Sequence, residues 1–114
     1  MRRFHWSLQR LLDVTGRREQ AQQAEVLALS REIARKRQDV LVRRMRVRQL
    51  LGELAGLAVT DRLGRHGELM RCTDAHEAEI RRVEGELAGL AKQRKEKTDI
   101  LMELRTKRET LEKL

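Results

Sequence analysis

The chain has 114 residues, a length that suits about one domain. Charged residues make up 39% of the chain, aromatic residues only 2%, and proline is absent. This composition argues against a compact globular core and favours long helices and coiled coils. The formal net charge of +8 indicates an acidic protein surface or a nucleic acid as the partner to consider.

The sequence shows neither the pattern of a membrane span nor that of a signal peptide. No apolar run approaches the roughly 20 residues of a membrane span. Arg2 and Arg3 are not followed by the apolar stretch of a signal peptide. The single Cys72 cannot form an internal disulfide and fits a reducing compartment. We therefore expect a cytoplasmic protein with no direct membrane insertion.

The first predicted element is a helix over about 4–56. Fifteen positions, spaced alternately by three and four residues, include ten aliphatic side chains. This 3.5-residue repeat indicates a left-handed supercoil and argues against disorder. The positions are Leu8, Leu12, Thr15, Glu19, Gln22, Val26, Leu29, Ile33, Lys36, Val40, Arg43, Val47, Leu50, Leu54 and Leu57.

A turn is predicted within 56–67. Four glycines interrupt the helical pattern around it, and Thr60 and Asp61 are good helix N-caps. A second helix is predicted over about 67–114, with eight aliphatic side chains among thirteen repeat positions. Those positions are Leu69, Thr73, His76, Ile80, Val83, Leu87, Leu90, Arg94, Lys97, Leu101, Leu104, Arg108 and Leu111.

The two apolar stripes must be buried against something, and each can be buried against the other. The predicted fold is all-α: two long helices forming an antiparallel coiled-coil hairpin, a single domain over 1–114. Residues 31–60 carry a net charge of +5 and residues 61–90 a net charge of −2. The hairpin would place the arginines of 43–48 opposite Asp74, Glu77 and Glu79, whereas the alternative, a parallel homodimer, would align each arginine cluster with its own copy.

No catalytic arrangement is evident. Cys72 and His76 lie four residues apart, but a zinc site needs four ligands, and a pair lining the helix interface is the simpler interpretation. Glu77 and Glu79 point to different helix faces, so they do not form an acid and base pair. We expect no enzyme activity, no metal and no cofactor.

The basic run at 34–48 has two interpretations. Phosphate groups of a nucleic acid are one possible target. The run lacks aromatic residues that could stack on bases and matches no groove-docking motif. An acidic protein surface is therefore preferred, with a basic nucleic-acid-binding or generic scaffold coiled coil as the alternative.

Phe4 and Trp6 are the only aromatic residues, and they lie one residue apart. Positions two apart on a helix point about 200° from each other, so both cannot face the same partner helix. We expect one to pack against Leu101, Leu104 or Leu111, and the other to point outward as an anchor for a second protein. The alternative is that the two rings only cover the end of the hairpin or stay disordered.

The start of the chain, MRRFHWSLQRLL, resembles the FliJ family of the bacterial flagellar type III export apparatus. The resemblance is carried by Arg2, Arg3, Phe4, Trp6, Leu8, Leu11 and Leu12. The far end is similar through Lys107, Arg108, Leu111, Glu112, Lys113 and Leu114. The chain departs from the family in lacking aromatic residues near the turn, and family members often continue further.

The resemblance implies a non-enzymatic stalk or escort role beside the export apparatus at the membrane, in a flagellum or an injectisome. The implied partners are the hexameric export ATPase, the export gate membrane protein and possible substrate chaperones. The candidate ATPase-binding residues are Arg2, Arg3, Phe4, Trp6, Lys107 and Arg108. The candidate residues of a second, turn-proximal surface are Arg44, Met45, Arg48, Gln49, Cys72, Arg81 and Arg82.

Overall fold

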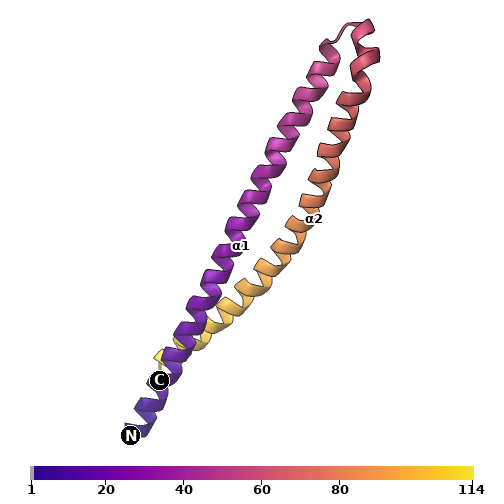
Figure 1. The fold of residues 1–114 in the computed structure, drawn as a ribbon. Helices are drawn as coiled ribbons and strands as arrows, with labels where there is room; N and C mark the ends of the chain where they lie inside the picture. The colour runs from indigo at the N-terminus through magenta and orange to yellow at the C-terminus, as the bar shows by residue number, and fades with distance from the viewer. Residues whose placement is uncertain (1) are drawn as a thin grey trace. The chain divides into compact units, whose positions relative to one another are not determined.

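The fold is all-α, as predicted, and consists of two long helices that form an antiparallel hairpin (Figure 1). The structure is a computed structural model that describes residues 2–114. Side chains are described for residues 3–58 and 64–114. Helix α1 covers Arg2–Gly56 and helix α2 covers Val59–Glu112. Within the described residues, neither helix contains a segment long and apolar enough to cross a membrane.

The connection between the helices is shorter than predicted. Residues 57 and 58 alone separate the two helices, and Leu57 donates a backbone hydrogen bond of 3.4 Å to Leu54. The expected start of the second helix near residue 67 was wrong. Gly64 and Gly67 lie inside α2 without a positive φ, because a cost of about 1 kcal/mol per helical glycine does not by itself end a helix. The side chains of Thr60 and Asp61, the predicted N-caps, lie outside the described residues.

The predicted interface positions are confirmed along both helices. All fifteen positions named for the first helix and all thirteen named for the second are buried or half-buried. The residues between them are mostly exposed. The spacing alone therefore identified which side of each helix packs against the other, and we call the set of these positions the seam.

Contacts along the hairpin group the chain into two compact units. The terminal unit consists of Met1–Glu32 and Leu90–Leu114, and the turn unit of Ile33–Gly89. Each unit pairs one segment of α1 with one of α2. The expectation of a single domain over 1–114 stays a prediction.

The turn unit has an aliphatic core. Val40, Ile80 and Val83 form a buried cluster, and Leu87 packs against it. Ile33, with 2% of its surface exposed, is the largest fully buried side chain among the described residues. Burial of a side chain of this size contributes about 1.5–3 kcal/mol, so these few positions supply much of the stability of the unit.

The terminal unit has a more polar interior. Its buried residues, among those described, are Leu101 and Thr15. Glu19 is half-buried at the next seam position along α1, and the side-chain oxygen of Gln22 is buried with no hydrogen-bond partner among the described residues. Packing in this unit therefore depends on polar pairing as well as on apolar contact.

Candidate protein-binding surfaces

Phe4 and Trp6 both lie exposed on the first turns of α1. The exposed fractions are 59% for Phe4 and 68% for Trp6. The guanidinium of Arg10 lies 5.6 Å from the centre of the Trp6 ring, and the Phe4 ring meets the His5 ring edge-on at 6.0 Å. Both of these ring contacts are with residues of α1.

The expectation that one aromatic ring packs against Leu101, Leu104 or Leu111 was wrong. Glu19 on α1 is bound by Arg105 and Arg108 on α2. In an antiparallel pair, a step towards the N-terminus of α1 moves the facing position towards the C-terminus of α2. Trp6 lies thirteen residues before Glu19, so its facing positions would be numbered beyond Leu114.

The basic residues predicted to accompany the aromatics are not equivalent. Arg3 and Lys107 are exposed, and neither makes an ion pair within the described residues. Arg108 is half-buried and donates to Glu19 at 2.6 Å and to Glu112 at 2.9 Å. Arg108 is therefore part of the helix pairing rather than a free surface charge. The side chain of Arg2 lies outside the described residues.

Glu19 is the electrostatic centre of the terminal unit. Hydrogen bonds from Arg108, and then from Arg105, hold the pKa of its carboxyl group below the usual value, although partial burial opposes this. The same carboxylate raises the pKa of Arg108. One acidic side chain of α1 thus connects to two arginines of α2 through charge-assisted hydrogen bonds, which are stronger than neutral ones.

The residues predicted for the turn-proximal surface separate into different surroundings. Arg44, Arg48 and Arg81 line one open groove of the turn unit. Met45 and Gln49 line a smaller hollow together with Arg48. Arg82 instead pairs along α2 with Glu79 and Glu86, and hydrogen bonding by Glu79 raises its pKa. Cys72 is exposed and belongs to neither hollow.

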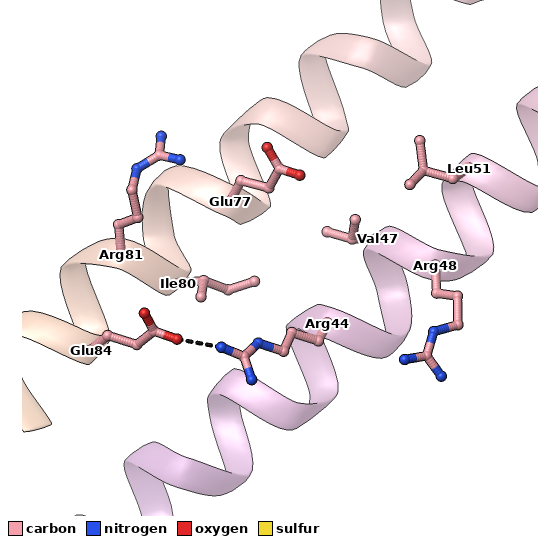
Figure 2. A pocket seen from close by; sticks show the side chains of 8 residues that line it. All are labelled: Arg44, Val47, Arg48, Leu51, Glu77, Ile80, Arg81 and Glu84. Atoms are coloured by element: carbon pink, nitrogen blue, oxygen red, sulfur yellow. Dashed lines mark hydrogen bonds and ion pairs between the residues drawn. The ribbon is translucent and has the colours of Figure 1, made fainter.

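The open groove has an apolar floor and charged rims (Figure 2). Its volume is about 410 Å³. Val47 of α1 and Ile80 of α2 point towards each other on the floor, and Leu51 extends the floor along α1. The Arg44 guanidinium of α1 donates to the Glu84 carboxylate of α2 at 2.5 Å, so an ion pair crosses the groove.

Arg44 forms its ion pair with Glu84 and not with Asp74, Glu77 or Glu79, the acidic residues expected to lie opposite 43–48. Cα–Cβ bonds tilt towards the N-terminus of their helix. In an antiparallel pair, Arg44 and Glu84 therefore lean towards each other although their backbones are offset. Arg43 pairs with Asp39 on its own helix and reaches the His76 ring at 3.2 Å.

The interpretation of Cys72 and His76 as a pair lining the interface was wrong for the cysteine. His76 is half-buried on the seam, but Cys72 is exposed because the seam position is its neighbour Thr73. Within the described residues, no group of three or more His, Cys, Asp or Glu side chains is placed to hold a metal ion.

Sequence reasoning missed the residues that shape the groove. Glu84 was not singled out, and neither was Leu51, whose side chain is 44% exposed. A signal was available: both occupy positions directly beside the predicted seam, where side chains flank the interface of a coiled coil. No family model, no curated protein and no solved structure matches the chain.

Proposed function

We propose that this chain is a non-enzymatic stalk or escort component of a type III export ATPase complex. The resemblance of its N-terminus to the FliJ family motivates the assignment. The observation that supports it best is the exposure of both Phe4 and Trp6 in the unit that also contains the end of α2. Exposed aromatic residues, tryptophan above all, are common anchors at protein interfaces.

In this proposal the terminal unit binds the ATPase ring. Arg3 and Lys107 provide exposed positive charge, which mainly accelerates association with an acidic ring opening. Phe4 and Trp6 provide the apolar contact that slows dissociation. The turn unit binds the export gate protein or a substrate chaperone. The complex is cytoplasmic and peripheral to the membrane.

The test is ATPase stimulation by the purified chain. The chain is mixed with the export ATPase encoded in the same genome, and hexamerisation and ATP hydrolysis are measured. We expect the wild-type chain to raise both, and the Phe4→Ala, Trp6→Ala double variant to lose the effect while retaining its helicity. A matched control is Ile100→Ala with Met102→Ala, which removes two exposed apolar side chains of α2 in the same unit.

Two results would count against the proposal in different ways. If the wild-type chain affects neither hexamerisation nor hydrolysis, the export role is wrong. If wild type and the aromatic double variant stimulate equally, the role of Phe4 and Trp6 is wrong.

The alternative function is nucleic-acid binding, favoured by the net charge of +8 and by exposed arginines such as Arg37, Arg46 and Arg48. Binding to duplex DNA would weaken with salt, with a log–log slope of about −0.9 per phosphate contact. A DNA titration at about 50 mM salt is decisive, since electrostatic binding is strong under that condition. Absence of binding there removes the alternative.

A further inference from the structure

The two sides of the seam in the turn unit are unlike. On one side, Lys36 reaches across to Glu86 at 2.6 Å, and Arg82 binds both Glu86 and Glu79. Hydrogen bonding by Lys36 lowers the pKa of Glu86, and hydrogen bonding by Arg82 lowers that of Glu79, so both carboxylates stay charged near neutral pH. This side is covered by an ion-pair network.

On the other side, two adjacent hollows in the surface lie against the apolar interior. The first is the groove with Val47, Leu51 and Ile80 in its lining. The second, of about 300 Å³, is lined by Val40, Leu41 and Leu87 among others. Both hollows share Arg44 and Glu84, so the single ion pair between these residues divides one longer groove into two.

The spacing of the hollows matches a helix. On α1 the first hollow is lined by residues of 44–51 and the second by residues of 37–44, an offset of one heptad. Seven residues rise about 10 Å in an α-helix. A third helix laid along the groove would therefore insert one large apolar side chain in each hollow if those side chains were seven residues apart.

The charges beside the groove indicate which charged residues should flank the apolar side chains of such a helix. Arg37, Arg48 and Arg81 lie along it and make no ion pair within the described residues, and Glu77 is the corresponding unpaired acid. Arg44 and Glu84 neutralise each other. The unpaired lining is thus basic on balance, which favours acidic residues on the occupant.

We propose that this groove of the turn unit binds an amphipathic helix of a partner protein, with two large apolar side chains one heptad apart and acidic flanking residues. Helices in apolar grooves are a recurring mode of peptide recognition. A second copy of this chain suits the groove less well, because its net charge of +8 would oppose the basic rims. The proposal depends on the groove alone and stands whether or not the export role holds.

The probe is a synthetic peptide of three heptads, about 21 residues, with leucines seven apart and glutamates beside them. A matched peptide carries lysine in place of every glutamate. Binding to the full chain is measured by fluorescence anisotropy. We expect the acidic peptide to bind at least about tenfold more tightly than the basic peptide, because rim charges select against the wrong sign.

Substitutions in the chain test whether the peptide binds in the groove. Arg48→Glu with Arg81→Glu should weaken the acidic peptide about tenfold or more, while Arg35→Glu with Arg71→Glu should change it little. The control pair alters net charge equally, and Arg35 and Arg71 are exposed, lie in the same unit and do not line the groove. Leu41→Ala with Leu51→Ala should also weaken binding several-fold, and both side chains are exposed enough for the fold to persist.

Three outcomes would overturn the proposal. The first is no binding of the acidic peptide at millimolar concentration. The second is equal weakening by both charge-reversed pairs, which would indicate attraction without a site. The third is a stable homodimer in sedimentation equilibrium that Leu41→Ala with Leu51→Ala dissociates, which would make a second copy the occupant.

Discussion

The terminal unit and the turn unit use the same heptad spacing but different chemistry. In the turn unit, aliphatic residues such as Ile33, Val40 and Val83 are buried, and ion pairs lie outside them. In the terminal unit, Thr15 is buried and the half-buried Glu19 receives two arginines. Apolar burial depends little on pH, whereas charge-assisted pairing depends on protonation, so the two units should respond differently to the same perturbation.

The largest expected effect comes from placing a charge in the aliphatic seam of the turn unit. Ile33→Asp should lower the free energy of unfolding by about 3–5 kcal/mol, because a buried charge is left without a partner. Leu87→Asp should act in the same direction. Thermal unfolding followed by circular dichroism measures the loss. The control Ala34→Asp changes an exposed neighbour and should cost far less; unchanged melting of both seam variants would contradict the seam assignment.

A smaller and more local effect is expected from Glu19→Gln. The substitution keeps the shape of the side chain but removes the charge that Arg105 and Arg108 share. We expect a cost of about 1 kcal/mol, since the site is only partly shielded from solvent. Amide hydrogen exchange should accelerate roughly five-fold in the terminal unit and little in the turn unit.

Glu25→Gln is the matched control for Glu19→Gln. Glu25 also pairs across the helices, with Lys97 at 2.9 Å, but half of its side chain is exposed. Exposed pairs contribute little, so its exchange profile should stay close to wild type. If the two variants had the same exchange profile, the ion pairs of Glu19 would stabilise the terminal unit no more than the exposed pair of Glu25 does.

Lowering the pH should reduce hydrogen-exchange protection in the two units of the wild-type chain to different extents. The pKa of Glu19 is lowered in the folded state from a reference value of 4.5. Its stabilising contribution is therefore complete above about 4.5 and is lost as the pH falls through the lower folded pKa. Hydrogen exchange between pH 7 and pH 3 should show protection falling first in the terminal unit.

The turn unit also contains carboxylates with lowered pKa values, Glu79 and Glu86, but its aliphatic seam does not titrate. Glu19→Gln should remove most of the extra acid sensitivity of the terminal unit. Equal loss of protection in both units would show that the ion pairs of Glu19 contribute no more than those of the turn unit.

The fold was predictable because heptad spacing is a direct record of burial. Positions as different as Ile33 and Lys36 were assigned to the seam by spacing alone, and both are shielded. The start of α2 was not predictable from Gly64 and Gly67, since a glycine weakens a helix without having to end it. Pairing of flanking side chains, such as Arg44 with Glu84, depends on stagger and on the tilt of the side chains, which composition does not encode.

The candidate sites were predictable only in part. The exposed aromatics stood out by their rarity, but whether a helix would cover them depended on the register between α1 and α2. The groove could not be predicted from the sequence, because no sequence motif corresponds to the hollow beside Val47 and Ile80. Charge runs such as 34–48 mark a surface without revealing which arginines are already paired.

The smallest expected effect on stability comes from the Phe4→Ala, Trp6→Ala double variant. Both side chains are more than half exposed, their ring contacts are with His5 and Arg10 of α1, and neither is a seam position, so their removal leaves the seam from Leu8 onwards intact. We expect the free energy of unfolding to change by less than about 0.5 kcal/mol, as for other surface substitutions. Circular dichroism melting of the double variant beside wild type measures this. A loss of more than about 1 kcal/mol would mean that the rings cover the end of the terminal unit and are not available to a partner.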